Sequence, residues 1–204
     1  MMGKMKHAPV LQTAWPIFLV CLCFFAGGVL GCLFASLACE ESVTQIGQYL
    51  ADYCKLIGER RISWSVPAVL WIHGRWLLGC ALRGLTGLGA LMLPVLFGAR
   101  GFLFAFGISC FFRIYSAAGL ISALLLYVVP ALLWAPGLFL TGFWGMRESI
   151  RLCRNRLSDT AALPGNTASF RLCVMMGFVL LVLCVFFECS LLPVLLPSAA
   201  RILG

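Results

Sequence analysis

The chain has 204 residues, of which 62% are hydrophobic and only 11% are charged, and its mean hydropathy is +1.03. Soluble domains are about half apolar and about a quarter charged, so this composition excludes an aqueous globular fold. The net charge of +8 would suggest nucleic acid as the partner of a soluble chain. In a membrane protein, arginines at the edges of spans fix topology, so we expect membrane lipid and no nucleic acid as the partner.

These values predict an all-α, polytopic helical membrane protein with residues 1–204 in a single membrane domain. A span takes about 20 apolar residues, so the chain has room for roughly four to six spans and no separate soluble domain. We expect about five spans and one amphipathic helix outside the membrane.

The first predicted span is the apolar run 15–37, which follows the short basic segment MMGKMKH. A cleaved signal peptide also begins in this way, but an apolar run of about 23 residues exceeds a signal-peptide core. We therefore favour a retained span with the N-terminus in the cytoplasm. Gly27 and Gly31 stand four residues apart, a spacing that allows close packing between membrane helices.

The polar segment 40–62 is predicted to form an amphipathic helix on the extracytoplasmic side. Ser42 and Gln45 have the spacing of a capping box. Apolar residues then recur at alternating intervals of three and four positions, namely Val43, Ile46, Leu50, Tyr53 and Ile57. Two roles stay open: the helix lies on the membrane face or caps the bundle, or it docks a partner helix.

The segment 63–80 combines tryptophans with His73 and Arg75, a composition typical of a membrane interface. We expect a second interfacial or re-entrant helix here. His73 has no Cys, Asp or Glu directly beside it in the sequence, so an interfacial hydrogen bond is favoured over a metal ligand or a proton relay.

Four more spans are predicted, over residues 77–97, 101–116, 117–145 and 172–196. A tight cytoplasmic turn at 98–101 would separate the first two. The segment 146–170 is predicted to be a cytoplasmic loop that touches anionic lipid, because arginines are dense in and beside it: Arg147, Arg151, Arg154, Arg156 and Arg171. Five spans place the C-terminus outside the cell membrane.

Two charges are predicted at membrane depth, Arg113 near the outer end of the third span and Glu188 in the last span. Ionisable residues within a membrane are functional candidates by default. We expect Arg113 and Glu188 to form a structural ion pair, with Arg83 as a competitor for Glu188. A transport pathway is the alternative.

The sequence offers little for catalysis. Hydrolysis and group transfer need paired carboxylates, a nucleophile beside a base, or a metal cluster. The chain has seven acidic residues and two histidines, and only Glu40 and Glu41 are adjacent. Most of the eleven cysteines lie in apolar runs, and none has the spacing of a zinc site. We therefore predict no enzymatic activity, no catalytic residues, no cofactor and no metal.

Glycines, prolines and aromatic residues from 79 to 136 form a recognisable series. In order, the series is Gly87, Gly89, Pro94, Arg100-Gly101-Phe102, Phe106-Gly107, Gly119, Pro130 and Pro136. It resembles the stage II sporulation protein M family of integral membrane proteins, and the likeness covers roughly residues 45–150. The resemblance implies a five-span, non-enzymatic scaffold in a bacterial membrane, with Gly87, Gly89, Gly101, Gly107, Gly119, Pro130 and Pro136 as helix-packing positions.

Members of that family recruit cell-wall hydrolases during engulfment of the developing spore. The leading hypothesis is therefore a scaffold that anchors extracytoplasmic, membrane-anchored partners through the helix at 40–62, in cell-wall remodelling. The alternative is a transporter or permease subunit with a polar path near Arg113 and Glu188. A third interpretation is a small helical subunit of an obligate complex, and a homo-oligomer is compatible with each of these.

Overall fold

The computed structural model describes residues 8–58, 65–157 and 167–190 of the chain. Within these ranges the protein is all-helical. The elements are α1 (Ala8–Leu37), α2 (Glu40–Gly58), α3 (Val66–Gly84), α4 (Gly89–Ala123), the π-helix η1 (Leu124–Val128), α5 (Val129–Leu157) and α6 (Thr167–Ser190).

Four helical stretches in the described ranges are long and apolar enough to cross a membrane: Trp15–Leu37, Gly89–Ala117, Gly119–Asn155 and Ala168–Ser190. Large apolar side chains cover their outer surfaces. Phe18, Phe25 and Phe186, for example, are 68%, 68% and 69% exposed. Contiguous apolar surface of this kind is compatible with lipid and unfavourable in water. The helices therefore indicate a multi-pass membrane protein, as the composition predicts.

The bundle contains a fifth helix, α3, which packs against α4, α5 and α6. Its 19 residues span about 28 Å at 1.5 Å per residue, close to the thickness of the hydrocarbon core. It carries His73, Arg75 and Arg83 and is not among the four apolar stretches. The main core cluster takes buried side chains from all five helices, namely Val20, Cys80, Leu93, Phe97, Ala131, Trp134, Leu138, Met146 and Cys184.

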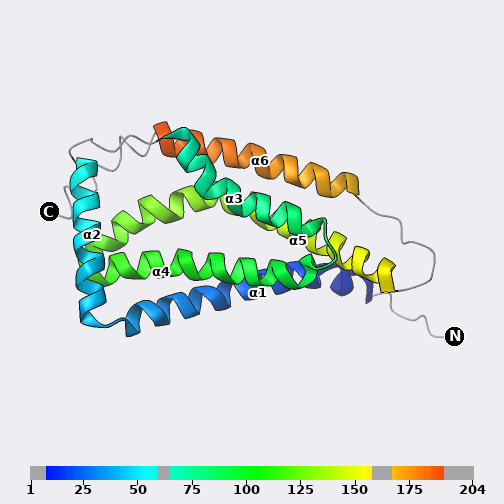
Figure 1. Ribbon diagram of the computed structural model, residues 1–204, viewed down its shortest axis with the longest axis horizontal. Helices are drawn as coiled ribbons and strands as arrows, with labels where there is room; N and C mark the ends of the chain where they lie inside the picture. The colour runs from blue at the N-terminus through cyan, green and yellow to red at the C-terminus, as the bar shows by residue number, and fades with distance from the viewer. Residues whose placement is uncertain (1–7, 59–64, 158–166, 191–204) are drawn as a thin grey trace.

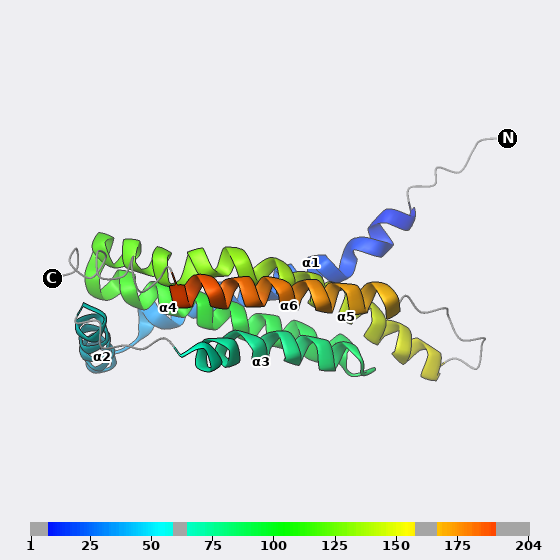
Figure 2. The same ribbon diagram turned by 90° about the horizontal axis from the view of Figure 1, so that it is seen from above.

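Helix α2 lies across one end of this bundle, and both views show it roughly perpendicular to the other helices (Figures 1 and 2). Glu40 and Glu41 occupy its first turn, where negative charge complements the helix dipole. The helix predicted at 40–62 is therefore present over residues 40–58, while 59–62 lie outside the described ranges, and it covers the end of the bundle at which α4 reverses into α5.

The turn predicted at 98–101 is wrong, and so are the boundaries of the spans predicted at 77–97 and 101–116. The chain turns instead between α3 and α4, at residues 85–88, and α4 continues through 98–101 as helix. The glycines at 98 and 101 serve packing rather than a turn. A Cβ on Gly101 would overlap the carbonyl oxygen of Phe24 in α1.

Helices α1 and α4 share the most extensive contact in the bundle. A Cβ on Gly27 would overlap the carbonyl oxygen of Gly98, and one on Gly31 would overlap that of Phe102. Small residues at such positions let two membrane helices approach to backbone contact. The packing face predicted from Gly27 and Gly31 is therefore confirmed, with α4 as its partner.

The reversal predicted between the third and fourth spans is confirmed at Ser116, which has φ 52° and ψ −132°. A positive φ is uncommon for a residue other than glycine and breaks the regular helix. Across the reversal, the rings of Phe111 and Tyr127 lie 6.0 Å apart between centroids. Gly119 sits against the backbone at Phe111, where a Cβ would overlap the carbonyl oxygen.

Much of the predicted loop at 146–170 is helical, because α5 continues to Leu157 and α6 begins at Thr167. Residues 158–166 of that loop, and 191–196 of the last predicted span, lie outside the described ranges. Within α5, Arg151 forms an ion pair with the buried Glu148. One arginine of the cluster is therefore neutralised within its own helix.

The hydroxyl of Ser149 joins the α3–α4 turn to α5. It donates to the carbonyl oxygen of Thr86 at 2.6 Å and accepts from the backbone N–H of Ala90 at 2.7 Å. Ser149 is fully buried, so these two bonds satisfy a hydroxyl that has no access to solvent. This side chain fixes the position of the turn.

Candidate functional site

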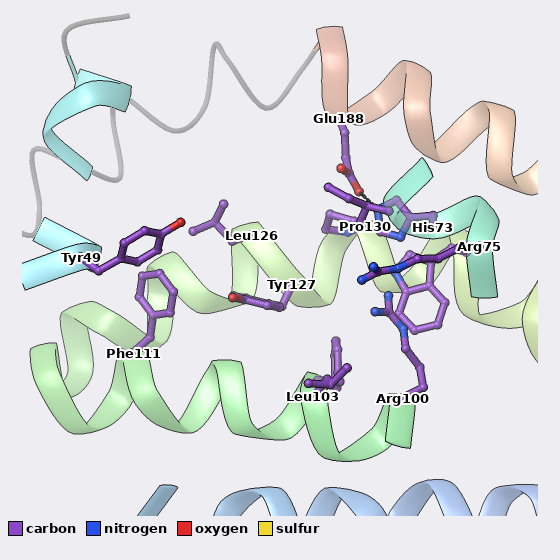
Figure 3. A pocket seen from close by; sticks show the side chains of 13 residues that line it. Tyr49, His73, Arg75, Arg100, Leu103, Phe111, Leu126, Tyr127, Pro130 and Glu188 are labelled. Carbon is purple, nitrogen blue, oxygen red and sulfur yellow. Dashed lines mark hydrogen bonds and ion pairs between the residues drawn. The ribbon is translucent and has the colours of Figure 1, made fainter. Parts of the chain in front are cut away.

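A cavity of about 440 Å³ lies inside the bundle, with walls from α3, α4, η1, α5 and α6 and one side chain from α2 (Figure 3). Its polar lining consists of Tyr49, His73, Arg75, Arg100, Tyr127 and Glu188. The remaining wall is apolar and includes Leu103, Phe104 and Leu126. Ligand sites of small molecules are usually clefts of about 300–1,000 Å³ with a few convergent polar groups, and this cavity has both properties.

His73 and Glu188 form the buried centre of this site. Nε2 of His73 lies 2.7 Å from Oε1 of Glu188, and the two side chains are 10% and 9% exposed. His73 comes from α3 and Glu188 from the last turn of α6. The His73 ring stacks on Trp134 of α5, with 6.1 Å between centroids and 27° between planes. Three helices thus fix this hydrogen-bonded pair.

Cys184 lies one helical turn before Glu188. Its Sγ is 3.5 Å from Oε1 of Glu188 and 3.6 Å from the carbonyl oxygen of Pro130. Ligand atoms of His73, Cys184 and Glu188 lie within 4.8 Å of one another, and these donor types suit zinc. Arg75 and Arg100 line the cavity beside them, however, and would repel a divalent cation. The arrangement favours a hydrogen-bonded network over a set of metal ligands.

Arg100 reaches this site from α4. Its guanidinium lies 4.2 Å from the ring centroid of Trp134 and 5.2 Å from that of Trp76. Arg75 lies 5.7 Å from the Trp76 centroid. Arg100 is half-buried, and stacking on tryptophan partly compensates the loss of water around its charge, whereas Arg75 is exposed. Within the described ranges neither arginine forms an ion pair. The nearby carboxylate of Glu188 is bonded to His73 instead.

Three buried side-chain nitrogens in the described ranges have no hydrogen-bond partner: His73 Nδ1, Trp76 Nε1 and Arg100 Nε. His73 and Arg100 line the cavity, and Trp76 lies beside them. Trp76 lines a second, much smaller void together with His73, Arg100 and Trp134. Buried polar groups are nearly always satisfied, so an unsatisfied set gathered in one place requires an explanation.

The π-helix η1 shapes the wall opposite α3. It carries Leu126 and Tyr127, which line the cavity, and it ends two residues before Pro130. Proline removes a helical hydrogen bond, and single-turn π segments within helices are frequent at functional sites. Gly107 of α4 makes room for the Tyr127 ring, because a Cβ there would lie 2.9 Å from its carbon atoms. Pro130, which is fully buried, lines the same cavity.

The predicted pair of Arg113 and Glu188 is not formed. Nη1 of Arg113 donates to the carbonyl oxygen of Ala35 at 2.5 Å, whereas Glu188 is bonded to His73. Arg83 donates to Gly79 of its own helix. The reason is the topology: Arg113 stands beside the reversal at Ser116, at the end of α1, while Glu188 is enclosed by α3 and α5.

The predicted docking residues of α2 divide into two groups. Val43 and Ile46 are half-buried, line a small void with Arg113 and Ile114, and so face the bundle. Ile46 also packs against the cluster around Phe111. Nothing is described for the side chains of Leu50, Tyr53 and Ile57. The first half of α2 therefore caps the bundle.

The remaining packing positions of the predicted series lie at close helix contacts or within helices. A Cβ on Gly89 would overlap the carbonyl oxygen of Arg83, which explains a glycine at the start of α4. At Gly87 a Cβ would make only ordinary contact, 3.7 Å from Cys153. Pro136 stands inside α5.

Sequence reasoning missed the importance of His73, Arg75 and Arg100. Arg100 was expected at a cytoplasmic turn because the turn was placed there, and His73 was expected at the interface because its partner is distant in the sequence. The available signal was an arginine near the middle of an apolar stretch, 89–117, combined with a tryptophan-rich helix that also carries a histidine.

Comparison with protein-family models, with curated proteins and with solved structures found no match. The resemblance to the stage II sporulation protein M family therefore stays a prediction. Function is inferred from the cavity itself.

Proposed function

We propose that the protein is a transporter or permease subunit whose path runs through the charged cavity between α3, α4, α5 and α6. The observation that carries the proposal is the His73–Glu188 pair, nine-tenths buried inside a helical bundle and open to a cavity shared with Arg75 and Arg100. Charges within a membrane are costly, and those that face a cavity commonly mark a solute pathway.

The same features argue against a purely structural ion pair. A structural pair needs no adjoining volume, and it would combine one cation with one anion. Here two arginines and one carboxylate share a cavity of about 440 Å³, and the carboxylate is already hydrogen-bonded to His73. The excess positive charge and the available volume both favour an exchangeable occupant.

The broken helices provide elements that could change shape. Ser116 interrupts the helix between the first and second halves of the α4–η1–α5 hairpin, and η1 and Pro130 interrupt it again beside the cavity. Transporters commonly place their binding sites at such discontinuous helices near the centre of the membrane. In this mechanism Leu126 and Tyr127 move together with η1. Helix α2 contributes Tyr49 to the lining and covers one end of the path.

The positive-inside rule supports an orientation for this path. The arginine-rich end of α5 would face the cytoplasm, so α2, at the opposite end of the bundle, would face outward (Figure 1). The scaffold function implied by the family resemblance stays a prediction. The docking hypothesis for the helix at 40–62 assigns Val43 and Ile46 to a partner. These side chains pack against α4, so docking through them would require α2 to leave the bundle.

Accessibility of the cavity to water tests the transport proposal. A cysteine at Leu103, which lines the cavity, should react with a membrane-impermeant charged thiol reagent added to either side of sealed vesicles, in a background without other reactive cysteines. Val95 of the same helix is 65% exposed and lines no described cavity, so Val95→Cys is the lipid-facing control and should stay unreactive. Labelling of Leu103→Cys from one side only, or from neither, would contradict a path across the membrane.

A further inference from the structure

We infer that the occupant of the cavity is a small organic monoanion, whose acid group is held by Arg75 and Arg100 and whose apolar body lies against α4 and η1. This inference rests on the proposed function and adds the chemical class of its solute. Its first support is the charge balance. The cavity has two arginine side chains, Arg75 and Arg100, against one carboxylate, Glu188, so one additional negative charge would balance the second arginine.

The second support is the kind of hydrogen-bonding group left unsatisfied. Arg100 lines the cavity, and its Nε, which can only donate, is buried without an acceptor. Trp76 Nε1, another buried donor without an acceptor, lines the small neighbouring void. In Figure 3 the nitrogen-bearing ends of Arg75 and Arg100 lie close together beside His73. Two guanidinium groups gathered beside a single carboxylate fit a ligand that brings further oxygens.

The third support is the shape and polarity of the rest of the wall. Leu103, Phe111 and Leu126 extend the cavity from the arginines towards α2 (Figure 3), and Phe104 also lines it. Such a wall suits an aromatic or short aliphatic body rather than a sugar or a fully hydrated ion. The acid group is a carboxylate or a sulfonate rather than a phosphate monoester, because a monoester carries close to two negative charges at neutral pH.

Guanidinium groups bind such acid groups through paired hydrogen bonds, which lysine does not reproduce. Arg100 is positioned for this role by its stacking on Trp134, which leaves the edge of the guanidinium, with its N–H groups, available. Glu188 is the competing anion. It offsets part of the positive charge when the ligand is absent, and it limits the affinity when the ligand is bound, which permits release.

Isothermal titration calorimetry on the full chain in a neutral detergent tests this inference, with benzenesulfonate as the probe and benzenesulfonamide as its uncharged isostere. We expect benzenesulfonate to bind the wild-type protein and benzenesulfonamide to bind at least about tenfold more weakly, because the arginines would lose a charged acceptor. Arg100→Gln should weaken benzenesulfonate binding by at least about tenfold. Arg83→Gln, whose side chain bonds to Gly79 outside the cavity, should leave it unchanged.

Equal binding of the two probes, or unchanged binding in Arg100→Gln, would overturn the inference. Arg75→Gln provides a second variant if Arg100→Gln fails to fold, and the two-probe comparison needs no variant at all. An anionic lipid headgroup carries the same chemistry, so a second arm repeats the titration in nanodiscs with and without phosphatidylglycerol. Binding of phosphatidylglycerol by the protein, with no binding of benzenesulfonate in either kind of nanodisc, would also overturn the inference, in favour of a lipid site.

The two proposals fail separately. Selective binding of benzenesulfonate together with a Leu103→Cys variant that is labelled from one side only would keep the anion site and reject transport. Labelling of Leu103→Cys from both sides, together with equal binding of benzenesulfonate and benzenesulfonamide, would support the transport path and reject an anion as its solute.

Discussion

Oε1 of Glu188 lies 2.7 Å from Nε2 of His73, although 115 positions separate the two residues in the chain. The contact joins the last turn of α6 to the middle of α3 inside a bundle whose outer surface is apolar. Both side chains are nine-tenths buried, and each depends on the other to satisfy a polar group that has left water. The cavity and its arginines are arranged around this contact.

The close contact of α1 and α4 predicts a sharp difference between adjacent glycines. Gly27→Ala should lower the free energy of unfolding by about 1–3 kcal/mol, because the new Cβ would overlap the carbonyl of Gly98 and separate the helices. Gly28→Ala is the matched control, since its Cβ would lie at ordinary contact, 3.6 Å from Cβ of Ala105. Thermal unfolding in detergent measures both. Equal stability of the two variants would contradict the backbone contact.

The α3–α4 turn should depend on one hydroxyl. Ser149→Ala removes the hydroxyl that donates to the carbonyl oxygen of Thr86 and accepts from the N–H of Ala90. Because this hydroxyl is buried, the change should lower the free energy of unfolding by about 1–3 kcal/mol. Hydrogen exchange should show the loss of protection at the N–H of Ala90. Ser36→Ala removes a hydroxyl that bonds only within its own helix at an exposed position, and it should change neither quantity measurably.

Cys39 should be an unusually reactive thiol outside the four apolar stretches. Its Sγ lies 3.1 Å from the hydroxyl of Ser42, and this hydrogen bond lowers the pKa of the thiol below its ordinary value of 9.0. A lowered pKa gives more thiolate at any pH below that value, so the half-maximal rate of maleimide labelling should occur below pH 9.0. Ser42→Ala should move this midpoint upward and slow labelling near neutral pH. An unchanged midpoint in Ser42→Ala would show that the hydroxyl does not stabilise the thiolate.

The sequence predicts a multi-pass helical membrane protein well, because composition and the length of apolar runs reflect whether lipid or water surrounds the chain. The helix at α2 and the reversal at Ser116 were also predictable, the first from its periodicity and the second from small residues between two apolar runs. The turn before α4 was not. The glycines at 98 and 101 look like turn residues locally, and only the presence of α1 shows that they are packing residues.

The site was harder to predict because each of its members comes from a different helix. Glu188 was recognised as a buried charge, but its partner could not be chosen among His73, Arg83 and Arg113 without knowing how the helices are ordered in space. Because a turn was predicted at 98–101, Arg100 was also predicted at the membrane edge. Once α4 is a single helix, Arg100 lies among tryptophans in the bundle, beside the pair that His73 and Glu188 form.

The central claim is that this cavity is a transport path for an anion, and flux of benzenesulfonate into proteoliposomes tests it most directly. Wild-type protein should take up the anion, and Glu188→Gln should reduce uptake to the level of protein-free liposomes, because the two arginines would then hold the ligand without a competing carboxylate. Glu148→Gln, which changes a buried carboxylate paired with Arg151 elsewhere in α5, should transport at the wild-type rate. Wild-type uptake by Glu188→Gln would contradict the account.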